Sequence, residues 1–220
     1  MEEYNRRKSE ITSYLKLVEI ISGDNVEIRN DDGEKHRITH LESTTLKASF
    51  YLVLYNLVEA TVREGVRSIY NKITDDGVSF MNLNEKLQEV WWHSHQESIT
   101  ATPKDALISR VYEVYCLCRS DSSPGFQDFI AGVSGNMDAE GVRSVCRKYG
   151  IDLIEDGRHL KKVKDYRNWL SHGNKSFSEV GKDSTPSELK TVMNQVIMFL
   201  DQYVNNISDY LDNSKYRLVV

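Results

Sequence analysis

Residues 43–73 read STTLKASFYLVLYNLVEATVREGVRSIYNKI, the longest helical stretch that the sequence predicts. Apolar side chains recur here every three or four positions, a spacing that places them in one wide stripe along an α-helix. The stripe comprises Leu46, Phe50, Val53, Leu54, Leu57, Val58, Thr61 and Val62. Since so wide an apolar face has to be buried, we expect this segment to be the central core helix.

Helical spacing also dominates on both sides of this segment. We predict helices over residues 2–22, 82–97, 103–119, 138–149, 159–171 and about 185–211. The last helix has a sharp start, because Thr185-Pro186-Ser187-Glu188 combines an N-cap, a first-turn proline and a capping-box glutamate. Residues 24–40 contain an Asp32-Gly33 turn signal and form either a short hairpin or an ordered loop. Residues 120–135 carry serine, proline and glycine and are expected to be a flexible connection.

These elements predict an all-α bundle of about six or seven helices, with the short hairpin as a possible addition. At 220 residues the chain is long enough for one full core, so we expect a single domain. Within it, residues 1–42 would form the N-terminal helix and the hairpin or loop, residues 43–212 the core bundle and residues 213–220 a tail. The sequence shows neither a βαβ unit nor a glycine-rich loop after a strand, so it does not indicate a nucleotide-binding fold.

The composition and charge limit which classes of function and which cellular compartment we expect. A net charge of −5 argues against coating nucleic acid by bulk electrostatics, so any polyanion must meet a local basic patch. Three cysteines without CxxC spacing, and an N-terminus without an apolar signal segment, predict a cytoplasmic protein. The longest apolar run, Phe50–Val58, is nine residues, whereas a membrane span needs about 20. We therefore expect no membrane partner.

The most informative short motif is Arg167-Asn168-Trp169-Leu170-Ser171-His172, followed by Gly173. An arginine clamps a phosphate bidentately and an imidazole moves a proton near neutral pH, so the pair holds two parts needed to cleave a phosphodiester without a metal. On an unbroken helix, residues five apart point about 140° away from each other. Gly173 predicts that the helix ends here. The alternative is a surface ion pair for Arg167 and a helix-capping role for His172.

Residues 164–173, together with Ser176-Phe177-Ser178-Glu179, resemble the signature of the HEPN superfamily of small helical-bundle proteins, many of which are ribonucleases. Residues 54–61 (LYNLVEAT), residues 134–138 (SGNMD) and the later Tyr149-Gly150 resemble a stand-alone branch found near prokaryotic restriction and defence genes. The likeness covers roughly residues 44–211. The toxin branch has a tyrosine two positions after the histidine; here Asn174 stands there, which weighs against a toxin–antitoxin role.

The resemblance implies a homodimer in which two motifs face one cleft and cut single-stranded RNA or tRNA, with no metal or other cofactor. The ribose 2′-hydroxyl would attack the adjacent phosphorus and leave a 2′,3′-cyclic phosphate. His172 would act as general base or acid, Arg167 would stabilise the phosphate charge and Asn168 would orient either group. The expected setting is defence or growth arrest, with a possible regulatory or defence-complex protein. The alternative is a non-catalytic HEPN module that binds RNA, nucleotide or a protein partner.

Basic and aromatic side chains surround the motif. Lys161, Lys162 and Lys164 precede it and Lys175 follows it, so these lysines are candidates for guiding the RNA backbone, although a solvated helix face is the simpler interpretation. Trp169 lies within the motif, where base stacking and a dimer contact are both plausible.

Two polar residues interrupt the apolar run of the core helix. Asn56 and Glu59 are one turn apart, and we expect each to make a buried structural hydrogen bond, with support of the site as the alternative. His93, His95 and Glu97 do not predict a metal site, because helical residues two apart point in opposing directions.

Overall fold

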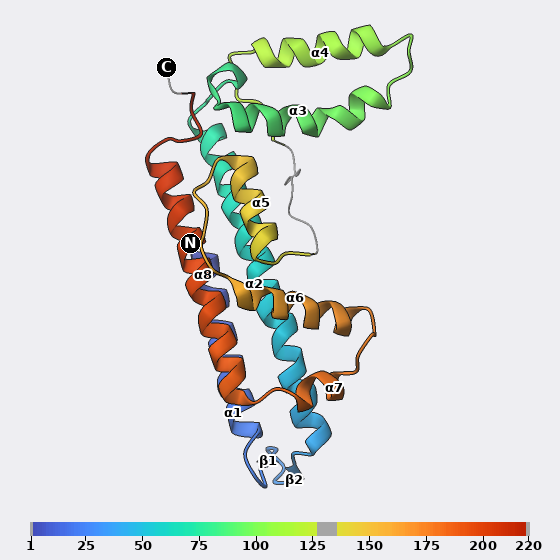
Figure 1. Ribbon diagram of the computed structural model, residues 1–220, viewed down its shortest axis with the longest axis vertical. Helices are drawn as coiled ribbons and strands as arrows, with labels where there is room; N and C mark the ends of the chain where they lie inside the picture. The colour runs from blue at the N-terminus through green and yellow to red at the C-terminus, as the bar shows by residue number, and fades with distance from the viewer. Residues whose placement is uncertain (1, 127–135, 219–220) are drawn as a thin grey trace. The chain divides into compact units, whose positions relative to one another are not determined.

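The computed structural model describes residues 2–126 and 136–218, except for the side chains of residues 97 and 98. These residues form eight α-helices, one 3-10 helix and one hairpin (Figure 1). In chain order the elements are α1 (Glu2–Ile21), β1 (Glu27–Arg29), β2 (Lys35–Arg37), α2 (His40–Asp75), η1 (Phe80–Asn82), α3 (Glu85–Thr100), α4 (Leu107–Arg119), α5 (Ala139–Tyr149), α6 (Arg158–Ser171), α7 (Phe177–Lys182) and α8 (Pro186–Asp212). The predicted all-α fold is confirmed.

Most predicted elements are present, and two helices differ from the prediction. The hairpin forms, and β1 and β2 pair antiparallel. Helix α4 begins at Leu107, so Pro103 precedes the helix and does not occupy its first turn. Helix α7 was not predicted from the sequence. The connection expected over residues 120–135 falls mostly on 127–135, and these, like tail residues 219–220, lie outside the described part.

The chain divides into two compact units, which we describe separately. The first contains residues 1–61, 135–139 and 155–201, and the second contains residues 62–134, 140–154 and 202–220. The assignment of residues 1–220 to one domain stays a prediction. Both units take part of α2 and part of α8, and the first unit contains the whole of α6.

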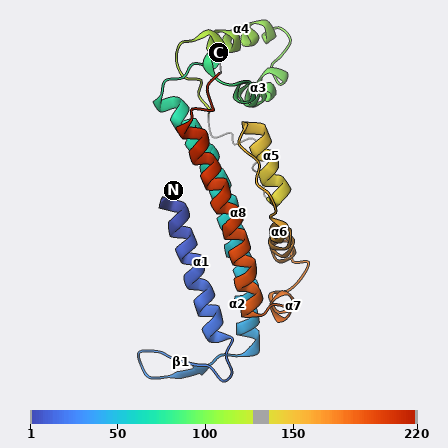
Figure 2. The same ribbon diagram turned by 60° about the vertical axis from the view of Figure 1, so that its left-hand side comes forward.

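In the first unit, α1 runs antiparallel to the first part of α8 (Figure 2). The hydroxyl of Tyr4 donates to Asp201 at 2.7 Å, and Glu19 pairs with Lys190 at 3.8 Å toward the opposite ends of the two helices. The buried side chains between these helices, α2 and α6 include Ile11, Leu15, Val18, Phe50, Tyr51, Leu54, Leu160, Val163, Leu189, Val196, Phe199 and Leu200. The stripe that the sequence predicts on residues 43–73 therefore forms part of the core.

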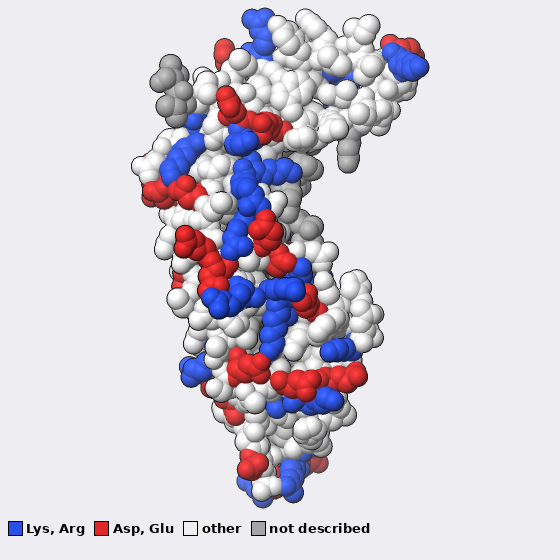
Figure 3. Space-filling model, in the orientation of Figure 1, with Lys and Arg blue, Asp and Glu red and all other residues white. Residues whose placement is uncertain are grey.

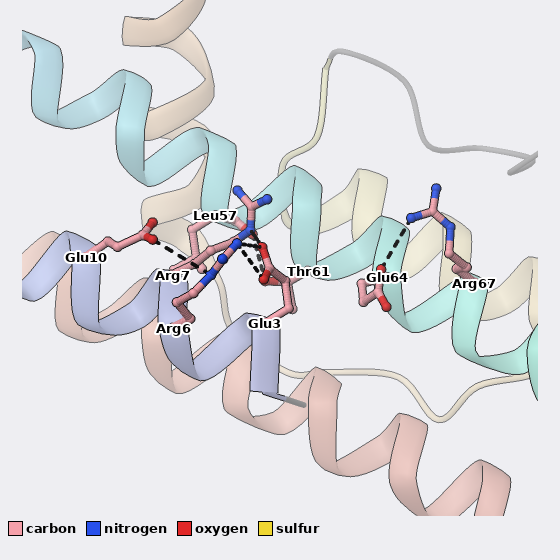
Figure 4. A network of polar contacts seen from close by, with 8 residues as sticks. All are labelled: Glu3, Arg6, Arg7, Glu10, Leu57, Thr61, Glu64 and Arg67. Carbon is pink, nitrogen blue, oxygen red and sulfur yellow. Dashed lines mark hydrogen bonds and ion pairs between the residues drawn. The ribbon is translucent and has the colours of Figure 1, made fainter.

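Polar side chains near the start of α1 pair within one helix. Glu3 accepts from Arg6 and Arg7, each at 2.7 Å (Figure 4).

On α2, Thr61 is buried within the predicted apolar stripe. It donates its hydroxyl to the Leu57 carbonyl one turn earlier at 2.7 Å. Because this bond satisfies the hydroxyl, a polar residue can occupy the core face without a large desolvation cost.

The second unit is built on the later parts of α2 and α8 and on α3, α4 and α5. A Cβ added to Gly65 would lie 2.5 Å from the Tyr203 hydroxyl oxygen, so glycine allows α2 and α8 to approach closely. Tyr203 donates to the Val62 carbonyl at 3.0 Å, and the hydroxyls of Tyr70 and Tyr149 lie 2.6 Å apart. No helix in the described residues is both long enough and apolar enough to cross a membrane.

Candidate functional site

Helix α6 presents the motif and ends where the sequence predicts. Gly173 adopts a left-handed φ of 69°, and the Asn174 N–H donates to the Trp169 carbonyl at 2.8 Å. The Gly173 N–H donates to the Leu170 carbonyl at 3.3 Å. Together these bonds form a Schellman motif, which satisfies carbonyls that the end of the helix would otherwise leave unpaired. The chain therefore turns away directly after His172.

Arg167 is half-buried and is held by two contacts inside the first unit. Its guanidinium carbon lies 4.4 Å from the centre of the Tyr55 ring, within the range of a cation–π contact. Its Nη1 donates to Asn168 Oδ1 at 2.8 Å. The described residues give Arg167 no carboxylate partner, so the surface ion pair considered as an alternative is not formed. The guanidinium is instead oriented by a ring and an amide.

Asn168 connects Arg167 to the segment before α5. Its Nδ2 donates to Asn136 Oδ1 at 3.0 Å, while the Met137 N–H donates to the Tyr55 hydroxyl at 3.0 Å. Tyr55 thus contacts this segment with its hydroxyl and Arg167 with its ring. That Asn168 orients a catalytic group stays a prediction; what the structure shows is its hydrogen bond with Arg167.

His172 occupies the C-cap of α6 with an exposed side chain. Its backbone N–H, not its ring, donates to the helix, at 3.0 Å from the Asn168 carbonyl. Among the described residues, its ring has no hydrogen-bond partner and no contact joins it to Arg167. One chain therefore fixes the arginine and presents the histidine to solvent, but it does not bring the two side chains together.

The candidate RNA-binding lysines differ in their surroundings. Lys162 pairs with Glu188, and Lys164 donates to the carboxylate of Asp138, a hydrogen bond that raises the pKa of Lys164. Lys161 is exposed and has no partner in the described part of the chain. Figure 3 shows basic and acidic side chains interleaved on the face that it draws. Lys162 and Lys164 are thus already neutralised by their carboxylate partners, whereas Lys161 is not.

Trp169 belongs to a short series of aromatic side chains in tilted and edge-on contact. Its ring lies 5.1 Å from that of Tyr166, whose ring lies 4.6 Å from that of Tyr51. The Nζ of Lys175 lies 3.9 Å from the centre of the Trp169 ring. A nucleobase could stack on the Trp169 face that Lys175 covers only after the exposed Lys175 side chain moved aside.

Comparison with known proteins places this chain in a family. The family model described as "HEPN_MAE_28990:/-like HEPN" matches residues 1–216. The chain belongs to the HEPN superfamily. No curated protein and no solved structure gives a match. The family match agrees with the helical bundle and with the resemblance seen around Arg167 and His172 in the sequence.

The polar residues predicted on the core helix of this HEPN chain have different outcomes. Asn56 is exposed, so the buried hydrogen bond expected for it was wrong; its position on α2 points away from the packed face. Glu59 is half-buried and lies one turn after Tyr55 on the same helix. Burial raises the pKa of Tyr55, and the nearby Glu59 carboxylate adds to the rise, while the Met137 N–H and Arg167 oppose it. The role of Glu59 as a support of the site stays a prediction.

Sequence reasoning assigned no role to Tyr55, Asn136 or Asp138, which all contact motif residues or their neighbours. A usable signal was the spacing of Tyr51, Tyr55 and Glu59, which are each four positions apart and therefore share one face of α2. That face meets α6, as the contacts of Tyr51 with Tyr166 and of Tyr55 with Arg167 show.

No three histidine, cysteine, aspartate or glutamate side chains are grouped to hold a metal ion within the described residues. His95 Nδ1 lies 2.9 Å from the Trp91 carbonyl and His93 Nδ1 lies 3.2 Å from Gln96, while the side chain of Glu97 is outside the description.

Proposed function

We propose that this HEPN protein is a metal-independent endoribonuclease that cuts single-stranded RNA or tRNA as a homodimer. The observation that carries the proposal is the arrangement on α6, where Tyr55 and Asn168 hold a half-buried Arg167 and the helix end exposes His172. A pre-oriented guanidinium stabilises the charge that develops on phosphate oxygens, and an exposed imidazole is accessible to a ribose hydroxyl.

The reaction follows from these groups. One His172 imidazole takes the proton from a ribose 2′-hydroxyl, and the oxygen attacks the adjacent phosphorus. The bond between phosphorus and the 5′-oxygen of the next nucleotide breaks, and that oxygen takes a proton from water, while the imidazolium returns its proton to the solvent. The products are a 2′,3′-cyclic phosphate and a 5′-hydroxyl. DNA, which lacks the attacking group, is not cleaved.

A second copy of the chain completes the site. Each centre needs one imidazole to take the ribose proton and one guanidinium to stabilise the phosphate charge. Because no contact joins Arg167 to His172 within the described chain, we assign to each reaction centre the arginine of one copy and the histidine of the other. This is the arrangement expected of an isologous dimer.

The lysines divide between two roles. Lys161 and Lys175 are exposed and contact the RNA backbone, while Lys162 and Lys164 brace α6 through their carboxylate partners. Trp169 receives a base when Lys175 turns to a phosphate. A role in defence or growth arrest, in the cytoplasm and with a regulatory or defence-complex partner, belongs to this proposal and rests on the family resemblance.

The test is incubation of the purified protein with total RNA and with tRNA in excess EDTA, beside the His172→Ala and Lys182→Ala variants. Lys182 lies on α7, outside the motif, and serves as a matched surface control. Cyclic-phosphate ends made by the wild type and the control, and absent with His172→Ala, support the proposal. Cleavage that persists in His172→Ala refutes the role of the histidine.

A non-catalytic HEPN module is the second candidate function. The pairing of Lys162 and Lys164 with carboxylates and the net charge of −5 favour it, because both limit attraction of RNA. In that case the protein binds RNA, nucleotide or a protein partner through the same surface, and His172→Ala leaves the binding unchanged while no RNA is cut.

A further inference from the structure

Tyr55 supports the motif arginine directly with its ring and indirectly through the segment that contacts Asn168. It is fully buried on α2, and its aromatic ring supports the Arg167 guanidinium at 4.4 Å. An aromatic ring is a better support than a carboxylate for a catalytic arginine, because it fixes the position of the cation without neutralising its charge. The guanidinium donors that the ring leaves open remain available to a phosphate.

The hydroxyl of the same side chain fixes the second support. It accepts from the Met137 N–H at 3.0 Å, and the preceding residue, Asn136, accepts from Asn168 at 3.0 Å. Asn168 in turn accepts from Arg167 at 2.8 Å. Arg167 is therefore held from two sides, and both supports lead back to Tyr55.

We propose that Tyr55 is a positioning residue for the RNA-cleaving site. Its ring fixes the position of the Arg167 guanidinium, and its hydroxyl holds the 136–138 segment that orients Asn168. This inference rests on the proposed function for its catalytic consequence, but the orientation of Arg167 is a property of the free protein. The two parts of Tyr55 have separable tasks. Removing the hydroxyl loosens the segment, whereas removing the ring releases the arginine.

The experiment compares Tyr55→Phe, which keeps the ring, with Tyr55→Leu, which removes it. Phe50→Leu is the matched control, because Phe50 is an equally buried ring on α2 that contacts Tyr14 and not the motif. Variants are compared after circular dichroism shows the wild-type helical content.

The first readout needs no enzymatic activity. The Arg167 Nε–H proton, assigned by its loss in Arg167→Lys, is followed by NMR. We expect it upfield of the position of free arginine in the wild type and in Tyr55→Phe, shifted to the free position in Tyr55→Leu, and unchanged in Phe50→Leu. The Met137 amide exchanges faster with solvent in Tyr55→Phe, because it loses its acceptor. A wild-type Arg167 signal at the free position overturns the proposal even if Tyr55→Leu does not fold.

The second readout is RNA cleavage. Loss of a desolvated cation–π contact lowers kcat by roughly tenfold in Tyr55→Leu, with little change in KM, because the support acts on the transition state. Tyr55→Phe, which keeps the ring, should retain most of the wild-type kcat. Equal kcat in Tyr55→Leu and Phe50→Leu contradicts the positioning role. If the Arg167 signal behaves as expected but the wild type cuts no RNA, the positioning is upheld and the proposed function fails.

Discussion

Replacing Lys164 with methionine tests whether the lysines of α6 brace the helix or bind RNA. The Lys164 and Asp138 side chains are only 20% and 22% exposed, so their ion pair lies between a surface pair and a buried one. Exposed pairs contribute up to about 1 kcal/mol, and removing one partner of a buried pair costs about 3–5 kcal/mol. Methionine keeps the apolar stem of the lysine. We therefore expect Lys164→Met to lower the free energy of unfolding by about 1–2 kcal/mol.

Urea denaturation followed by circular dichroism measures this change, and Lys161→Met is the matched control. Lys161 is exposed and without a partner in the described residues, so its replacement should stay within about 0.5 kcal/mol of the wild type. A double-mutant cycle with Asp138→Asn isolates the coupling between the two partners. RNA affinity should follow the opposite order, with a larger loss in Lys161→Met than in Lys164→Met. Wild-type stability in Lys164→Met, together with weakened RNA binding, would refute the bracing role.

Three further changes test the fold around the site. Gly181→Ala should cost about 1–3 kcal/mol, because the new Cβ would lie 1.9 Å from the Thr44 carbonyl oxygen and force α7 away from α2; an unchanged urea midpoint would contradict this close approach. Gly173→Ala should cost about 1 kcal/mol through its φ of 69°, and Gly173→Asn less, as measured by thermal melting. Hydrogen bonds from the N–H and hydroxyl of Thr39 lower the pKa of Glu42 from 4.5 to about 2, so the stability that this carboxylate contributes is present above about pH 4.5 and is lost as the pH falls toward 2. The difference in urea midpoint between wild type and Glu42→Gln should shrink over that interval, and a constant difference would count against the assignment.

The sequence was most informative where a local pattern decides the structure. The apolar stripe on residues 43–73 predicted α2, and Gly173 predicted the end of α6, because both depend on neighbouring residues alone. The start of α8 was predicted equally well, and the Thr185 hydroxyl accepts from the Glu188 N–H at 3.2 Å. The Glu188 carboxylate, however, pairs with Lys162 on α6.

Contacts between distant segments explain what the sequence did not predict. Lys162 and Lys164 each find a carboxylate 26 positions away, beyond any helical spacing rule. Helix α7 has six residues, too few to show a helical period, although its capping box of Ser176 and Glu179 was a readable signal. The exposure of Asn56 depends on which face of α2 the other helices cover, which periodicity alone does not fix.

The candidate catalytic residues show the same division. The sequence identified Arg167, Asn168 and His172 as a motif, and the structure adds the support that Tyr55 gives to the arginine. That support joins residues far apart in the chain and is visible only in the folded protein.

Mixing of two variants that we expect to be inactive alone tests the central claim that Arg167 and His172 act together across a dimer. Arg167→Ala and His172→Ala proteins are unfolded together, refolded and assayed with RNA in EDTA beside the wild type and each variant alone. Half of the randomly formed dimers are mixed and each contains one intact centre, so we predict roughly a quarter of the wild-type rate, with cyclic-phosphate ends, from two proteins that are inactive alone. Mixed dimers without activity, or a wild type that leaves the RNA intact, would contradict the account.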